Sequence, residues 1–292
     1  MAIWNRRELV ARVGAGAGVL GVASLSGCAL DQQLRNRVQV GGAGNAQSAA
    51  GNAAAAGLNT PGTPEYAARQ QLLARFPQGL LKDDYVARTE FDSVWAIRNT
   101  TKTLPRYFGA DMKWYINVPE PYGFMETREQ PLGKAGFDAM RKGLAAQIDT
   151  KPWHLVKGKG RPVLVVYSAW DCPHSRNMEA ALRRAGISYY LVPSGLEEKS
   201  TALARRIYAT PEFDRQWQEL LTKGSISGKL GVQAQPYPED RATDLIFIFK
   251  TVSGIPSPAP STPLFIFKDG RSGEGWRAES MLPLIRKANQ YF

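Results

Sequence analysis

The residue types that most often build reactive or metal-binding sites are scarce in this chain of 292 residues. It contains two cysteines, Cys28 and Cys172, and two histidines, His154 and His174. The cysteines are far apart in sequence, so a structural disulfide between them has little support. Two thiols and two imidazoles at these positions give no zinc-ligand spacing, and we predict neither a metal nor another cofactor.

Long apolar runs and dense basic runs are also absent. The apolar stretch at residues 13–27 is too short to be a comfortable transmembrane helix. The formal net charge is +11, but the lysines and arginines are spread along the chain. We interpret this charge as general surface character and predict no nucleic-acid binding. Hydrophobic residues make up 43% of the chain, which is enough for a real core.

Residues 1–27 have the organisation of a secretory signal peptide, with three arginines before the apolar stretch. Leu25-Ser26-Gly27-Cys28 resembles a lipobox, and this resemblance implies cleavage before Cys28 and lipidation of that cysteine. An ordinary signal peptide with a chance cysteine is the alternative. Because Ala29 rather than an aspartate follows, the resemblance implies sorting to the outer membrane. We therefore expect a protein of the oxidising periplasm, held at a membrane by its acyl chains.

Two segments of different composition follow the expected anchor. Residues 28–62 are rich in Gly, Ala, Asn and Gln, which predicts a flexible tether. Residues 63–150 contain aromatic and branched residues separated by turn signals, which predicts a small α+β domain. Its expected elements are helices at 64–76 and 136–148 and strands at 94–97 and 113–118. We find no catalytic pattern in this segment.

The remaining segment, 151–292, has the pattern of an α/β domain. A continuous apolar run at 162–167 predicts a strand buried on both faces. A helical stretch follows Cys172 and ends at Gly186, and a second strand is expected at 187–192. This is a strand–helix–strand unit with a cysteine at the N-terminus of its helix.

A cysteine at a helix N-terminus has a chemical use. Unpaired backbone N–H groups and the helix dipole stabilise an anion there, so they favour the thiolate, which is the nucleophilic form of cysteine. Pro173 suits the first turn because it has no N–H to satisfy. His174 would add positive charge or a hydrogen bond to the sulfur. We therefore assign Cys172 and His174 as candidate catalytic residues, an exposed loop histidine being the alternative for His174.

The segment Cys172-Pro173-His174-Ser175 resembles the active-site motif of the thioredoxin superfamily, with serine in place of the last cysteine. The region as a whole resembles the DsbC/DsbG disulfide-isomerase family, with a helical insertion at about 200–223, a Thr-Pro pair before an apolar strand, and a closing helix at 277–291. The resemblance implies a thioredoxin-like fold for 151–292 and a cis peptide bond before Pro263. By position, it implies substrate contact by Trp170, Pro173, Ser175, Thr262 and Pro263.

The chain departs from the family pattern at two places. Ser175 stands where a resolving cysteine would be, so Cys172 cannot close a disulfide within this motif. A single thiol can still attack a substrate disulfide and form a mixed disulfide. The proline-rich stretch 255–260, just before Thr262, would reshape the groove in which the family binds extended peptide.

Three further features are assigned to structure rather than to chemistry. Residues 238–253 read locally as a strand, but a helix start at Pro238 and a helix stop at Gly254 favour a helix. His154 has no neighbour in sequence that suggests chemistry. Trp217, with Leu220 and Leu221, is expected to be helix core. For Trp170 the sequence leaves two roles open, substrate contact and simple packing.

Two functions remain open on the sequence alone. The first is a membrane-tethered monothiol protein of the DsbC/DsbG type, which exchanges or isomerises disulfides of exported proteins. The second is a redox-inactive binding or scaffold component of an envelope assembly, such as a secretion or conjugation system. The relatives dimerise through an N-terminal domain, and residues 63–150 occupy the corresponding position, so a homodimer stays open as well.

Overall fold

The computed structural model describes residues 60–75, 80–81, 83–99, 105–112, 115–116, 125–126, 134–228, 230, 236–252 and 262–292. The expected signal peptide, Cys28 and nearly all of the expected tether lie outside these ranges. So does the proline-rich stretch 255–260.

The N-terminal part is a helix on an antiparallel sheet. The helix is α4 (Pro64–Arg75), and the strands are β1 (Asp84–Arg88), β2 (Val94–Asn99), β3 (Arg106–Gly109), β4 (Tyr115–Ile116) and β5 (Met125–Glu126), in that order across the sheet. A small core lies between α4 and the sheet, made by Ala68, Leu72, Val86, Ile97, Phe108 and Met112. This is the expected α+β unit, except that the helix expected within it at 136–148 is not part of its core: Leu144 and Ala145 of that helix pack with residues 242–252 and with Val165 of the second sheet.

The second sheet has the order β10-β9-β7-β8-β6. Its strands are β6 (His154–Val156), β7 (Leu164–Ala169), β8 (Tyr189–Ser194), β9 (Leu264–Phe267) and β10 (Ser272–Glu274). Strands β7 and β8 are parallel and joined by α6 (Pro173–Arg184), whereas β9 is antiparallel to β7 and β10 to β9. This arrangement of two parallel strands, a crossover helix and an antiparallel hairpin is the thioredoxin fold, as the sequence predicts.

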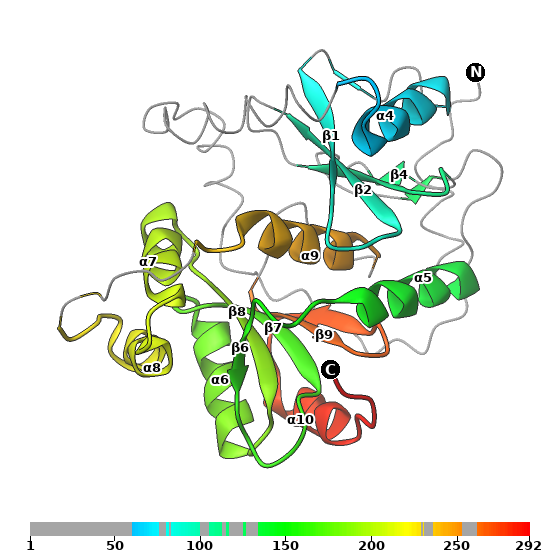
Figure 1. The fold of residues 1–292 in the computed structure, drawn as a ribbon. Helices are drawn as coiled ribbons and strands as arrows, with labels where there is room; N and C mark the ends of the chain where they lie inside the picture. The colour runs from blue at the N-terminus through cyan, green and yellow to red at the C-terminus, as the bar shows by residue number, and fades with distance from the viewer. Residues whose placement is uncertain are drawn as a thin grey trace, which may run out of the picture.

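Helices cover both faces of this sheet (Figure 1). Successive residues of β7 point to opposite faces: Leu164 and Val166 join one core, and Val165 joins the other. The first core is shared with α6, α7 (Glu198–Tyr208), α8 (Phe213–Lys223) and α10 (Ala278–Arg286). The second is shared with α5 (Lys134–Gln147) and α9 (Glu239–Val252). Strand β7 is therefore buried on both faces, as its continuous apolar sequence indicates.

Helix α9 lies between the two sheets (Figure 1). Residues Leu245–Phe249 are all buried, and they share one core with Phe91, Val94 and Tyr107 of the N-terminal part. A helix enclosed on all sides needs apolar residues all round, which explains why this segment resembles a strand in sequence. The predicted helix at 238–253 is confirmed.

Two expected helices differ from the structure in extent. The insertion is two helices rather than one, because α7 ends at Tyr208 and α8 begins at Phe213. Pro211 between them has no N–H to donate, and the Thr210 hydroxyl donates to the Ile207 carbonyl instead. The closing helix α10 ends at Arg286, five residues before the expected end, and the chain continues without regular structure.

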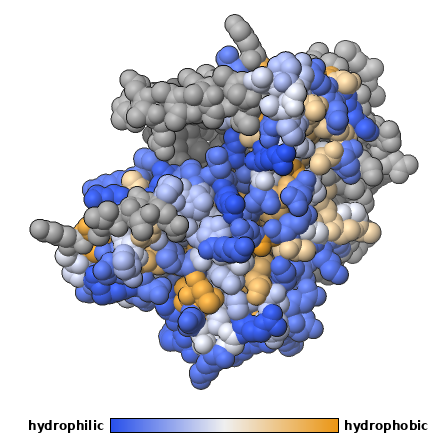
Figure 2. Space-filling model, viewed as in Figure 1, coloured by the Kyte–Doolittle hydropathy of each residue, from blue (hydrophilic) through white to orange (hydrophobic). Residues whose placement is uncertain are grey.

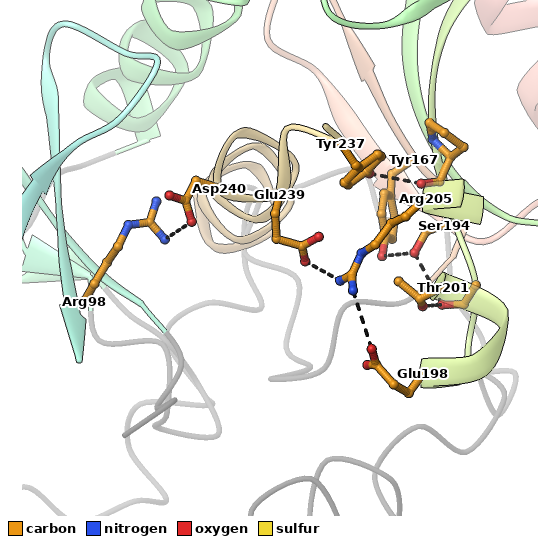
Figure 3. Close-up of polar contacts among 11 residues, drawn as sticks. Arg98, Tyr167, Ser194, Glu198, Thr201, Arg205, Tyr237, Glu239 and Asp240 are labelled. Atoms are coloured by element: carbon orange, nitrogen blue, oxygen red, sulfur yellow. Dashed lines mark hydrogen bonds and ion pairs between the residues drawn. The ribbon is translucent and has the colours of Figure 1, made fainter. Parts of the chain in front are cut away.

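Arginines from two different parts of the chain hold the first turn of α9 (Figure 3). Arg98 of β2 forms an ion pair with Asp240 at 3.1 Å, and Arg205 of α7 pairs with Glu239 at 2.5 Å. Acidic residues at a helix N-terminus also interact favourably with the helix dipole. The two ion pairs connect α9 to the N-terminal sheet on one side and to the insertion on the other.

One turn further along α9, Asp244 lies buried against the N-terminal sheet. Its carboxylate accepts hydrogen bonds from Arg98 Nη2 and from the Tyr107 hydroxyl, each at 2.9 Å. Burial raises the pKa of Asp244 to about 6, although the nearby Arg98 guanidinium opposes this shift.

Glu90, in the turn between β1 and β2, is a second carboxyl group at this junction. Both of its carboxylate oxygens are buried without a hydrogen-bond partner among the described residues. Burial raises the pKa of Glu90 to about 8; Arg241 opposes the shift, and Asp244 and Asp149 add to it. Glu90 is therefore mostly neutral at pH 7.

The face of the molecule in Figure 2 is largely hydrophilic, and its hydrophobic side chains form small separate areas. Within the described residues, no helix has both the length and the apolar character needed to cross a membrane.

The raised pKa of Glu90 predicts a pH-dependent stability. The folded state retains a proton on Glu90 that the unfolded chain releases near its ordinary pKa, so the free energy of unfolding falls as pH rises from about 4.5 to about 8. In Glu90→Gln this part of the decrease, about 4 kcal/mol, should be missing from urea unfolding curves recorded between pH 5 and 9. Asp92→Asn, which removes an exposed carboxylate of the same turn, should follow the parent. Parallel curves for Glu90→Gln and the parent would contradict this assignment.

Candidate functional site

Cys172 occupies the N-cap of α6, three residues after β7 ends. Its backbone N–H donates to the Ala169 carbonyl at 3.0 Å, and Pro173 opens the helix behind it. The backbone of Cys172 is extended, with φ −88° and ψ 122°, and the side chain makes no capping hydrogen bond. The residue is 1% exposed. The predicted position of the thiol at the N-terminus of a helix is thus the observed one.

The thiol contacts the Thr262–Pro263 segment, 90 residues away in sequence. Cys172 Sγ donates to the Thr262 carbonyl oxygen at 3.4 Å, and the peptide bond between Thr262 and Pro263 is cis, as the family resemblance implies. The Pro263 carbonyl in turn accepts a hydrogen bond from the Gly275 N–H at 2.9 Å, just after β10. The structure therefore brings together three of the predicted site residues.

Thr262 carries a second polar atom at this place. The residue is 8% exposed, and its hydroxyl oxygen has no hydrogen-bond partner in the part of the chain that the structure describes. A buried hydroxyl without a partner is costly unless a ligand, a water molecule or another group supplies one.

The charged side chains nearest to Cys172 in sequence are bonded to backbone groups. Helix α6 has no acidic residue in its first turn; Arg176 lies there, with its Nε donating to the Trp170 carbonyl at 2.7 Å, and Arg183 and Arg184 lie in the last turn. The nearest acidic neighbour in sequence is Asp171, whose carboxylate accepts the Leu196 N–H at 2.8 Å in the loop after β8. Backbone N–H groups at a helix N-terminus favour an anion in general, which is the chemical reason to test Cys172 as a thiolate.

The other predicted residues have mixed outcomes. The Ser175 hydroxyl accepts the Ala169 N–H at 3.3 Å, so it stabilises the end of β7 rather than the sulfur. Trp170 donates its indole N–H to the Ser200 carbonyl at 3.0 Å, which is a packing role. His174 is half-buried, and no hydrogen bond between it and Cys172 is found among the described residues. Its role as thiolate stabiliser stays a prediction.

Sequence analysis missed Glu179, two turns after Cys172 on α6. Its carboxylate is fully buried and accepts hydrogen bonds from Ser168 of β7 at 2.5 Å, Tyr189 of β8 at 3.0 Å and the Trp217 indole of α8 at 3.0 Å. Its position in the sequence could have identified it, because Glu179 lies on the same helical face as Met178 and other apolar residues of α6.

Burial raises the pKa of Glu179, and the Ser168, Arg183, Trp217 and Tyr189 groups oppose that shift. Arg183 lies 3.8 Å from the carboxylate across one helical turn. The network joins α6 to both parallel strands and to α8, so it fixes the helix that carries Cys172.

His154 has the structural role expected from the sequence. Its ring stacks on Phe213 with centroids 3.6 Å apart, and Nε2 lies 2.5 Å from the Tyr208 carbonyl. Trp217 and Leu220 are completely buried, and Leu221 nearly so, which confirms their assignment to the core. Among the described residues, no group of three or more His, Cys, Asp or Glu side chains could hold a metal ion.

Comparisons with known proteins find similarity among solved structures. No protein-family model and no curated protein matches the chain. Among solved structures, the disulfide interchange protein from Neisseria gonorrhoeae is similar over 49% of this chain and 99% of its own, with 20% sequence identity and a TM-score of 0.40. A similarity of this degree does not assign an activity.

Loss of the Glu179 carboxylate should destabilise the site helix. Glu179→Ala leaves the buried Trp217 and Tyr189 donors without an acceptor, which should lower the free energy of unfolding by about 3 kcal/mol in urea titrations. Asn177→Ala removes an exposed polar side chain from the same helix and should cost about 0.5 kcal/mol or less. Equal losses in the two variants would show that the buried network does not stabilise α6.

Proposed function

We propose that the protein carries out thiol–disulfide exchange on exported proteins, with Cys172 as its single nucleophilic thiol. The observation that carries this proposal is the contact between Cys172 Sγ, at the N-terminus of α6, and the Thr262 carbonyl beside Pro263. The unpartnered Thr262 hydroxyl adds a polar group for a bound chain. The family resemblance of these residues supports the same chemistry.

The reaction needs no external oxidant. The Cys172 thiolate attacks one sulfur of a substrate disulfide, a new S–S bond forms to Cys172, and the other substrate sulfur leaves as a thiolate. A second thiolate, from the substrate or from a small thiol, then attacks the mixed disulfide and releases Cys172. When that thiolate belongs to the substrate, the net result is isomerisation with no change in oxidation state.

Ser175 determines how the mixed disulfide is resolved. A cysteine at this position would attack the bond from within the motif, and serine cannot. Cys28 is the only other cysteine of the chain and belongs to the expected lipid anchor. The lifetime of the mixed disulfide therefore depends on a thiol from outside the site.

The N-terminal sequence supports a cellular location for this chemistry, the periplasm. We propose that the chain is exported to the periplasm and held at a membrane, by sequence the outer membrane, through lipidated Cys28. Exported proteins with cysteines or disulfides are then its substrates.

The burial of Cys172 favours a second candidate function. A thiol that is 1% exposed and donates to a backbone carbonyl resembles a structural cysteine. In that case the thioredoxin-like fold would be a binding module in an envelope assembly such as a secretion or conjugation system. Reactivity of the thiol distinguishes the two functions.

The first test traps the mixed disulfide. The full chain carrying Cys28→Ser, which leaves Cys172 as its one thiol, is incubated with oxidised glutathione or a peptide containing a disulfide, and its intact mass is recorded. We expect one adduct per chain that a reducing agent removes, and no adduct when Cys172→Ser is added.

The matched variant in this test is Ser175→Cys, which supplies a resolving thiol. It should accumulate much less adduct and should form an intramolecular disulfide instead. Absence of any adduct on the native parent would exclude exchange and leave the binding module.

The lipid anchor predicts a separate result in cells. The parent and Cys172→Ser should both be found in the membrane fraction and be released by detergent, whereas Cys28→Ser should lose this association because no acyl chain can be attached. Immunoblots of fractionated envelopes measure the distribution. Membrane association of Cys28→Ser equal to that of the parent would exclude Cys28 as the anchor.

A further inference from the structure

A buried ion pair lies beside the thiol site but outside the motif. Lys250, in the last turn of α9, has a side chain that is 3% exposed, and its Nζ lies 3.2 Å from Glu274 Oε1 on β10. The Glu274 side chain is 15% exposed. Neither of these two atoms has a hydrogen-bond partner among the described residues, so within the described residues the ion pair is the main compensation for each charge.

Packing alone does not explain a lysine at this position. The preceding residues of α9, Ile248 and Phe249, are completely buried and apolar. Burial lowers the pKa of Lys250, and Glu274 opposes that shift. Because desolvation of two charges often costs as much as their attraction returns, the pair is not expected to add much to the global stability of the fold, although it is a directional contact between α9 and β10. We therefore expect the Lys250–Glu274 ion pair to have a role other than stabilising the fold.

Three contacts lead from the pair to the thiol. Glu274 is paired with Leu264 across the β9–β10 ladder, and the next residue, Gly275, donates its N–H to the Pro263 carbonyl at 2.9 Å. Thr262, immediately before, accepts the hydrogen bond from Cys172 Sγ at 3.4 Å. The end of the hairpin that Lys250 holds is thus the end that faces Cys172.

The other end of the hairpin is fixed independently. Gly270, in the turn, lies so close to α5 that a Cβ there would be 2.4 Å from the Arg141 carbonyl carbon. Lys268 donates to the Ala145 and Ala146 carbonyls at 3.4 and 3.3 Å. Lys268 is therefore a matched control, a partly buried lysine that holds the same hairpin away from the thiol.

We propose that the Lys250–Glu274 ion pair is a positioning element of the thiol site, which holds the Thr262–Pro263 segment against Cys172 and so limits access to the sulfur. The importance of this restricted access for catalysis rests on the proposed exchange function. Access to the sulfur is itself a property of the thiol site and can be measured without a substrate. Without the pair, the segment separates from Cys172 more often, while the apolar packing of α9 remains.

The experiment measures the alkylation rate of Cys172 by iodoacetamide in the full chain carrying Cys28→Ser. Lys250→Met with Glu274→Met removes both charges together and avoids an uncompensated buried charge. We expect its rate to be roughly tenfold higher than that of the parent, because one charge-assisted contact changes an opening equilibrium by about this factor. Lys268→Met should react at the parent rate.

The urea dependence of alkylation separates local opening from loss of the fold, and a further variant tests the ion pair. Below about 1 M urea, alkylation through local opening is nearly independent of urea, whereas alkylation through global unfolding accelerates steeply. Glu274→Gln, which is isosteric but leaves Lys250 without its counter-charge, should also react faster than the parent.

Each outcome decides the proposal. The proposal is supported by a urea-independent increase in the alkylation rate of the Lys250→Met, Glu274→Met double variant and of Glu274→Gln, with no increase in Lys268→Met. This holds even if the parent forms no mixed disulfide, because that result would exclude the exchange function alone. Unchanged or slower alkylation in both pair variants would overturn it. An increase in the alkylation rate that depends on urea, or that Lys268→Met also shows, would overturn the proposal as well.

Discussion

The buried carboxylate of Glu179 is the interaction on which the geometry of the thiol site depends. It joins α6 to β7 through Ser168, to β8 through Tyr189 and to α8 through Trp217. These contacts set the angle at which α6 leaves the sheet and therefore the place of Cys172 at its N-terminus. A carboxyl group at this depth is tolerated because Ser168, Tyr189 and Trp217 donate to it and Arg183 lies 3.8 Å away, which offsets part of its desolvation.

Helix α9 has the corresponding role on the opposite face of the sheet. Its first turns are held by Arg98 and Arg205, and its last turn holds β10 through Lys250. The N-terminal sheet, the insertion and the hairpin beside Cys172 therefore all meet on one helix. This explains why α9 is buried from Asp244 to Lys250 although the sheets it separates belong to different parts of the chain (Figure 1).

The sequence predicted the local patterns well and the long-range contacts poorly. The strand–helix–strand unit around Cys172 follows from apolar runs and helix-end signals that act within a few residues, and the Thr262–Pro263 pair was found through a family resemblance. Glu179 and Lys250 were not found, because the partners of a buried charge lie on other elements and only the fold brings them together. The break between α7 and α8 was missed although Pro211 marks it. The family resemblance implied substrate contact by Ser175, whereas Ser175 is completely buried and its hydroxyl accepts the Ala169 N–H.

Cys172 is subject to two opposing physical influences. The helix N-terminus favours the reactive thiolate, and burial beneath the Thr262 carbonyl restricts access to it. The most direct measurement is the rate constant for Cys172 with oxidised glutathione, in the native chain carrying Cys28→Ser and in the same chain unfolded in urea. If the fold makes Cys172 a nucleophile for exchange, the native chain reacts faster than the unfolded one. A native rate below the unfolded rate would contradict this account and show that the fold protects the thiol.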